Sequence, residues 1–130
     1  MCISELFQQV GAPLANIRWS WGGVRQDGAV VLRVWQNETR RIDGQTHIRL
    51  THHQAFVGNE DDLGYRERLR HMSQIQAGAA CYLVMCEPRS TNEVPRSIKA
   101  FNERALFHAG ELIEQDGDFW VSLASREPIH

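Results

Sequence analysis

The chain has 130 residues and a formal net charge of −2, with 14 lysines and arginines against 16 aspartates and glutamates. This length suits one hydrophobic core, so we expect a single domain over residues 1–130 and exclude an enzyme with separate cofactor and substrate domains. Hydrophobic residues make up 42% of the chain and charged residues 23%, which excludes disordered and collagen-like chains. The acidic excess excludes a strongly basic nucleic-acid-binding protein, although residues 17–57 carry six arginines against three acidic residues.

Nothing in the sequence indicates a membrane segment or an export signal. No apolar run approaches the ~20 residues of a membrane span, and the first residues lack the basic start and apolar stretch of a signal peptide. The three cysteines, Cys2, Cys81 and Cys86, include no Cys-x-x-Cys pair, which is typical of a reducing compartment. We therefore expect a cytoplasmic protein without membrane association, with Cys81 and Cys86 as buried thiols on opposite faces of one strand.

Three Asp-Gly pairs between strand-like segments indicate hairpin turns, and they lie at residues 27–28, 43–44 and 116–117. Tight hairpin turns need positive φ, which Asp tolerates and Gly adopts freely. Alternating apolar residues around these turns predict five strands, over residues 17–25, 29–37, 45–53, 111–114 and 118–123. We expect the first three strands to pair in sequence order as a meander and the last two to form a hairpin.

Two segments have the spacing of amphipathic helices. Four apolar residues predict the main helix over about residues 65–76, and Gly78 provides the left-handed residue that ends it. The nearly uninterrupted apolar segment of residues 79–86 then predicts a central strand buried on both faces. The first ten residues predict a short N-terminal helix, and residues 97–101 predict a further strand.

These elements together predict a strand-rich α+β fold. We expect a partly closed β-barrel of antiparallel or mixed strands, with one main helix and a short N-terminal helix. Such a barrel has a mouth, and the mouth is where a ligand would bind.

No residue pattern predicts catalysis or a metal centre. His47 and His53 would share one face of a strand and His52 the other, and no cysteine or carboxylate cluster supplies further metal ligands. The chain has no Gly-x-Ser-x-Gly elbow, and a buried thiol at Cys81 or Cys86 is inert. We therefore expect a non-catalytic protein that uses no cofactor and no metal.

Aromatic and arginine side chains alternate along the predicted strands. Aromatic faces stack on nucleic-acid bases at ~1–3 kcal/mol each, and guanidinium groups neutralise phosphate. The alternative is that the tryptophans serve cross-strand and core packing. The residues concerned are Trp19, Trp21, Trp35, Arg18, Arg33 and Arg49, with Tyr82 nearby in a barrel.

The segment from the main helix into the central strand resembles PUA-like barrels. The helix Tyr65 to Gln76 runs through Ile75-Gln76-Ala77-Gly78-Ala79 into Cys81-Tyr82-Leu83-Val84-Met85. This looks like the helix, glycine turn and central strand of that superfamily, which includes EVE, ASCH and SRA-type domains. The resemblance covers residues 17–123 in architecture. It implies binding of RNA or DNA, with a modified or flipped base in a pocket between barrel and helix.

With this resemblance, the aromatic and arginine residues suggest recognition of a base rather than bond-making. An extruded base would be held between aromatic faces such as Trp21 or Trp35 and Tyr82. Asn102, His53 or the backbone would read the polar edges of the base. The flanking phosphates would be held by Arg18, Arg33, Arg49 and Arg96.

Two other functions fit the same residues. The barrel mouth could take a small organic ligand, as a binding protein or accessory enzyme without nucleic acid, which suits the acidic net charge better. Alternatively, the protein could be an interaction module that forms homo-oligomers through an exposed strand edge or an aromatic patch.

Overall fold

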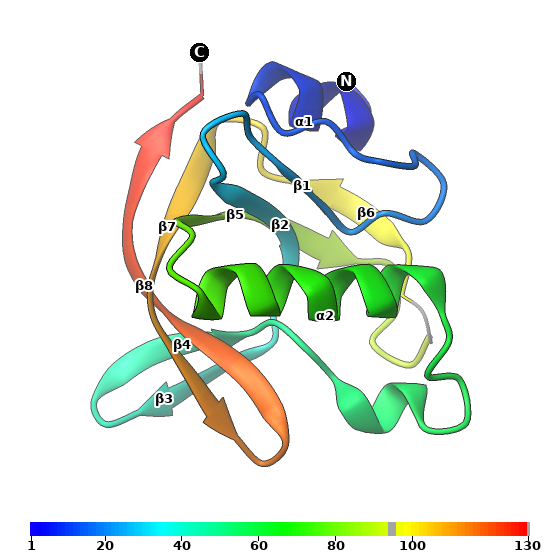
Figure 1. Cartoon of the computed structure of the whole chain (residues 1–130), viewed down its shortest axis with the longest axis vertical. Coiled ribbons are helices and arrows are strands. Elements are labelled where there is room, and N and C mark those ends of the chain that lie inside the picture. The colour runs from blue at the N-terminus through cyan, green and yellow to red at the C-terminus, as the bar shows by residue number, and fades with distance from the viewer. Residues whose placement is uncertain (94–95, 130) are drawn as a thin grey trace.

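The computed structural model describes residues 1–93 and 96–129, which form a strand-rich α+β fold, as the sequence predicts (Figure 1). The helical elements are α1 (Ile3–Gln9), the 3-10 helix η1 (His53–Phe56) and α2 (Leu63–Gln76). The strands are β1 (Gly22–Val24), β2 (Val30–Trp35), β3 (Thr39–Ile42), β4 (Gln45–Arg49), β5 (Cys81–Pro88), β6 (Ile98–Phe101), β7 (Ala105–Gln115) and β8 (Asp118–Pro128). The helices α1 and α2 lie where the sequence predicts the short and the main helix.

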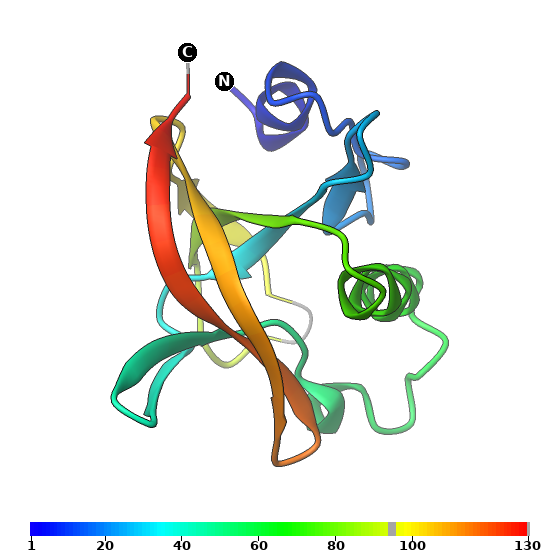
Figure 2. The same ribbon diagram turned by 60° about the vertical axis from the view of Figure 1, so that its left-hand side comes forward.

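All these strands belong to one mixed sheet. Its order is β1-β2-β5-β7-β8-β4-β3, and β6 pairs with the end of β5. Among the strands of the described residues, only β2 and β5 run parallel, and the other neighbouring strands are antiparallel. The sheet curls until β4 approaches β2 again, but no ladder joins these two strands (Figure 2). The prediction of a partly closed barrel with mixed strands is therefore confirmed.

The three predicted Asp-Gly turns are present. Asp43 and Gly44 have φ values of 51° and 80° between β3 and β4, and Asp116 and Gly117 have 53° and 82° between β7 and β8. Two consecutive positive φ values define the hairpin turn whose twist matches that of the strands. In the turn between β1 and β2 only Gly28 is left-handed, with φ of 90°.

The helices α1 and α2 cover opposite faces of the sheet. Met72 of α2 packs in a core that contains Cys81 and Leu83 of β5, whereas α1 packs on a second core that contains Val84 and Cys86 of the same strand. Alternate residues of β5 thus enter two different cores, which explains its continuous apolar sequence. Cys81 and Cys86 are buried on opposite faces, as predicted.

The first predicted strand is too long, and the predicted meander is wrong beyond its first pair, because β1 and β2 do pair antiparallel. Residues 17–19 form a turn, and only Gly22–Val24 is a strand. The Ser20 hydroxyl and the Trp21 backbone N–H donate to Glu67 of α2, and only the Trp21 carbonyl still accepts from the Arg33 N–H of β2. The strand β2 does not pair with residues 45–49 but lies parallel to β5.

Within residues 1–93 and 96–129, no helix is long and apolar enough to cross a membrane.

Burial of His71 predicts that the fold is sensitive to acid. His71 is 7% exposed, and its Nδ1 has no hydrogen-bond partner in the described part of the chain. Burial lowers the pKa of His71 below its usual value of 6.5. Below about pH 6.5 the unfolded chain binds a proton that the folded chain resists, so stability is complete above this pH and falls as the pH decreases.

We expect the free energy of unfolding, measured by urea titration, to fall between about pH 6.5 and 5.5 and to fall less in His71→Gln. A parallel His52→Gln variant controls for the other histidine whose pKa burial lowers. Identical pH slopes for the wild type and His71→Gln would show that His71 does not cause the effect.

Candidate functional site

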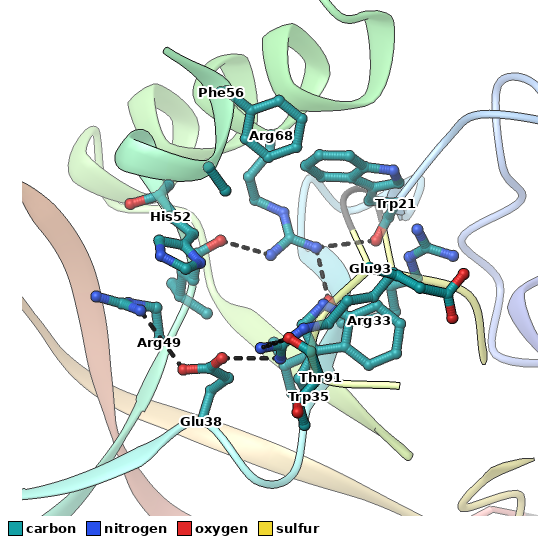
Figure 3. A pocket seen from close by; sticks show the side chains of 15 residues that line it. Trp21, Arg33, Trp35, Glu38, Arg49, His52, Phe56, Arg68, Thr91 and Glu93 are labelled. Carbon is teal, nitrogen blue, oxygen red and sulfur yellow. Dashed lines mark hydrogen bonds and ion pairs between the residues drawn. The ribbon is translucent and has the colours of Figure 1, made fainter. Parts of the chain in front are cut away.

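A pocket lies where the sheet does not close, between the ends of β2 and β4 and beside α2 (Figure 3). Its volume is about 110 Å³, several times the ~10–15 Å³ that one water molecule needs. The 3-10 helix η1 and residues that follow β5 complete the wall. The charged side chains that line it are Arg33, Glu38, Arg49, Arg68, Glu93 and Arg96.

Arg68 of α2 bridges the gap in the sheet. Its Nη1 donates to the carbonyl of Leu50, just after β4, at 2.8 Å. Its Nη2 donates to the carbonyls of Trp21 at 3.1 Å and of Arg33, on β2, at 2.6 Å. The residue is 4% exposed, and burial lowers its pKa to about 10, so the guanidinium remains charged at neutral pH. One buried cation therefore replaces the missing ladder between β2 and β4.

Two further residues of α2 fix the position of Trp21. The carboxylate of Glu67 is buried and accepts from the Trp21 backbone N–H at 2.8 Å and from the Ser20 hydroxyl at 2.7 Å. The indole of Trp21 lies so close to Gly64 that a Cβ at position 64 would clash with its Cε2 atom. Trp21 is thus held by its backbone and by its ring, and Gly64 leaves the space that the ring occupies.

Arg33 lies between two indole rings at the wall of the pocket. Its Cζ atom is 5.8 Å from the ring centroid of Trp21 and 5.6 Å from that of Trp35. Arg33 and Trp35 share one face of β2 because they are two residues apart. Burial lowers the pKa of Arg33, and its guanidinium makes no hydrogen bond or ion pair with a described residue. Its donors are therefore available to a ligand.

The other pocket arginines already have partners. Arg96 pairs with Glu38 at 2.7 Å, and Arg49 pairs with the second Glu38 oxygen at 3.5 Å. Arg49 also reaches the buried carboxylate of Asp118 at 3.4 Å. These pairs place Glu38 between two cations, so they shape the pocket and fix its acidic group.

The pocket carries more positive than negative charge. Four arginines against two glutamates give an excess of two positive charges on its wall. Burial lowers the pKa of His52, and the positive charge of Arg49 lowers it further, so the imidazole is neutral at pH 7. Such a site suits a planar ligand whose edge is rich in hydrogen-bond acceptors.

The sequence-predicted residues divide into two equal groups. The pocket brings together the five residues Trp21, Trp35, Arg33, Arg49 and Arg96.

The other five predicted residues do not line the pocket. Arg18 and Trp19 lie in the turn of residues 17–19. Tyr82 packs on the α1 side of the sheet, where Arg25 lies over its ring at 4.5 Å. The remaining two bond within the protein: His53 Nδ1 to Asp118 at 3.1 Å, and the Asn102 side-chain oxygen to the backbone N–H groups of Arg104 and Ala105.

Sequence reasoning missed several residues that form the pocket. For Arg68 a signal existed, because it lies three residues after Tyr65 and four before Met72, on the same helix face as these apolar residues. An arginine on the apolar face of a helix is expected to have an interior partner. Glu38 and Phe56 carry no such signal, since the loop after β2 brings Glu38 to the pocket and the 3-10 helix η1 brings Phe56.

The thiols of β5 are not reactive, and no metal cluster is present in the described residues. Burial raises the pKa of Cys81 and of Cys86 to about 12, so both stay protonated at neutral pH. Among residues 1–93 and 96–129, no three His, Cys, Asp or Glu side chains are grouped so that they could hold a metal ion.

No protein-family model, curated protein or solved structure matches the chain.

We expect Arg68→Met to destabilise the protein by about 3 kcal/mol or more, because the substitution removes a buried cation and leaves three carbonyl groups without this donor. Urea unfolding measures the change. Arg66→Met is the matched control, since Arg66 is exposed on the same helix and a surface substitution usually changes stability by less than about 0.5 kcal/mol. Equal stability of the two variants would contradict the bridging role of Arg68.

Proposed function

We propose that this protein is a non-catalytic binding module that recognises nucleic acid and takes an unstacked or extruded base into the pocket between α2, β2 and β4. One observation carries the proposal: Arg33 lines the pocket between Trp21 and Trp35, and its guanidinium has no polar partner among the described residues. A base is planar, stacks on aromatic faces and offers acceptors at its edge, so it matches this wall in shape and in chemistry.

The position of Arg33 decides how the base is held. Because the guanidinium lies between Trp21 and Trp35, a base cannot be inserted between these two rings. The base instead occupies the cavity itself, where Phe56 and His52 also contribute to the wall. Arg33 then faces the edge of the base, and Tyr82 has no part in holding it.

The arginines have two different tasks in this proposal. Arg49 and Arg96 are paired with Glu38, so they position the wall of the pocket rather than hold phosphates. Phosphates are held by exposed arginines such as Arg18, in the turn just before Trp21. Phosphate contacts of this kind orient a strand without reading its sequence, and they weaken with salt.

The resemblance to PUA-like barrels supports the same function. That resemblance implies a base pocket between the barrel and its main helix. The pocket of this protein lies beside α2, at the gap between β2 and β4 where the sheet does not close.

A second candidate function is binding of a free small ligand. It is favoured by the acidic net charge of the whole chain and by the limited volume of the pocket. A free nucleotide or another planar acid would satisfy Arg33 without any contact to a phosphate backbone.

We expect single-stranded RNA, plain duplex DNA or cytosine-modified duplex DNA to quench the tryptophan fluorescence saturably, with weaker binding at moderate than at low salt. Arg33→Met should weaken binding about tenfold or more, because it removes a charged donor while keeping an apolar stem. Arg126→Met is the control, since Arg126 is exposed on β8, away from the pocket.

Two outcomes would contradict this proposal. Unchanged affinity of Arg33→Met for nucleic acid would show that the pocket is not the binding site. A lack of response to all three nucleic acids, with quenching by free nucleotides, would support the small-ligand alternative.

A further inference from the structure

The guanidinium of Arg33 lies beside two aromatic rings and has no polar partner among the described residues. The two indoles flank its guanidinium, and among the pocket arginines it alone has no polar partner in residues 1–93 and 96–129. A guanidinium presents neighbouring N–H groups in one plane, which match two acceptors placed side by side. A ligand with a single acceptor would leave part of this donor pair unused, and a positively charged ligand would be repelled by the guanidinium.

Glu38 gives the same pocket an acceptor for ligand donors. Each of its carboxylate oxygens faces one arginine, with Oε1 paired to Arg96 and Oε2 to Arg49. An ionised carboxylate has about four lone-pair sites, so acceptor capacity remains. The two ion pairs also keep the side chain of Glu38 in place at the cavity (Figure 3). The wall of the pocket thus combines the neighbouring N–H donors of Arg33 with the fixed carboxylate acceptor of Glu38.

Only some bases carry the complementary edge. Guanine presents O6 and N7 as neighbouring acceptors, with the N1–H donor next to O6. An unpaired cytosine presents O2 and N3 as neighbouring acceptors, with its N4 amino group next to N3. On the pairing edges of adenine, uracil and thymine, acceptors alternate with donors, so none of these bases offers two neighbouring acceptors.

We propose that the pocket selects guanine or cytosine over adenine, uracil and thymine, with Arg33 binding the two neighbouring acceptors and Glu38 accepting from the adjacent N–H donor. This selection rests on the proposed base-binding function of the same pocket. Arg33 is then the residue that determines specificity, while Trp21 and Trp35 orient it.

The test uses short single-stranded oligonucleotides in which one variable base is flanked by abasic spacers, titrated against the full chain. We expect oligonucleotides with guanine or cytosine to bind at least about tenfold more tightly than those with adenine or uracil, as for a bidentate contact. Replacing guanine with 7-deazaguanine, which lacks the N7 acceptor, should remove most of this advantage. Free guanosine and cytidine monophosphates, run in parallel, show whether the base must be part of a strand.

Arg33→Lys separates specificity from affinity. Lysine keeps the positive charge but lacks the planar fork, so the preference for guanine and cytosine should shrink while binding persists. Arg126→Lys, an exposed substitution outside the pocket, should retain the preference. Equal binding of all bases, or an unchanged preference in Arg33→Lys, would overturn this selection and leave base binding in place. Binding no stronger than that of an all-abasic strand would overturn both.

Discussion

The buried guanidinium of Arg68 is the interaction on which the rest of the structure depends. The curled sheet brings β2 and β4 close together without a ladder, and Arg68 donates to carbonyls on both sides of that gap. A carbonyl buried at an unpaired strand edge costs free energy unless it receives a donor. Because Arg68 of α2 donates three such hydrogen bonds, the barrel is stable although it stays open between β2 and β4.

The open seam is also what creates a binding site. A fully closed ladder would fill the space between β2 and β4 with backbone, whereas a side-chain bridge leaves a cavity with a charged wall. The same helix that supplies Arg68 holds Trp21 through Glu67 and Gly64, and Trp21 in turn flanks Arg33. Stability and ligand recognition are thus coupled, because the helix that bridges the gap between β2 and β4 also holds Trp21 beside Arg33.

Local patterns in the sequence predict much of the fold, whereas the pocket depends on long-range pairing. The Asp-Gly turns, the helix before Gly78 and the doubly buried β5 follow from turn chemistry and periodicity, which need only neighbouring residues. Within residues 17–25 the strand is shorter than the alternation predicts, because Glu67, far along the chain, accepts from the Trp21 backbone N–H. For the same reason the sequence indicates Arg49 and Arg96 but not their partner Glu38.

The most direct test of the base-binding pocket is a nuclear magnetic resonance titration of the isotope-labelled protein with a single-stranded oligonucleotide. The side-chain N–H signals of Trp21, Trp35 and Arg33 report on the pocket, and the backbone N–H signals of α1, which packs on the other face of the sheet, serve as an internal reference. We expect the first three signals to shift together and saturably while those of α1 stay in place. Shifts confined to Trp19 and the exposed arginines would place the nucleic acid elsewhere and contradict the account.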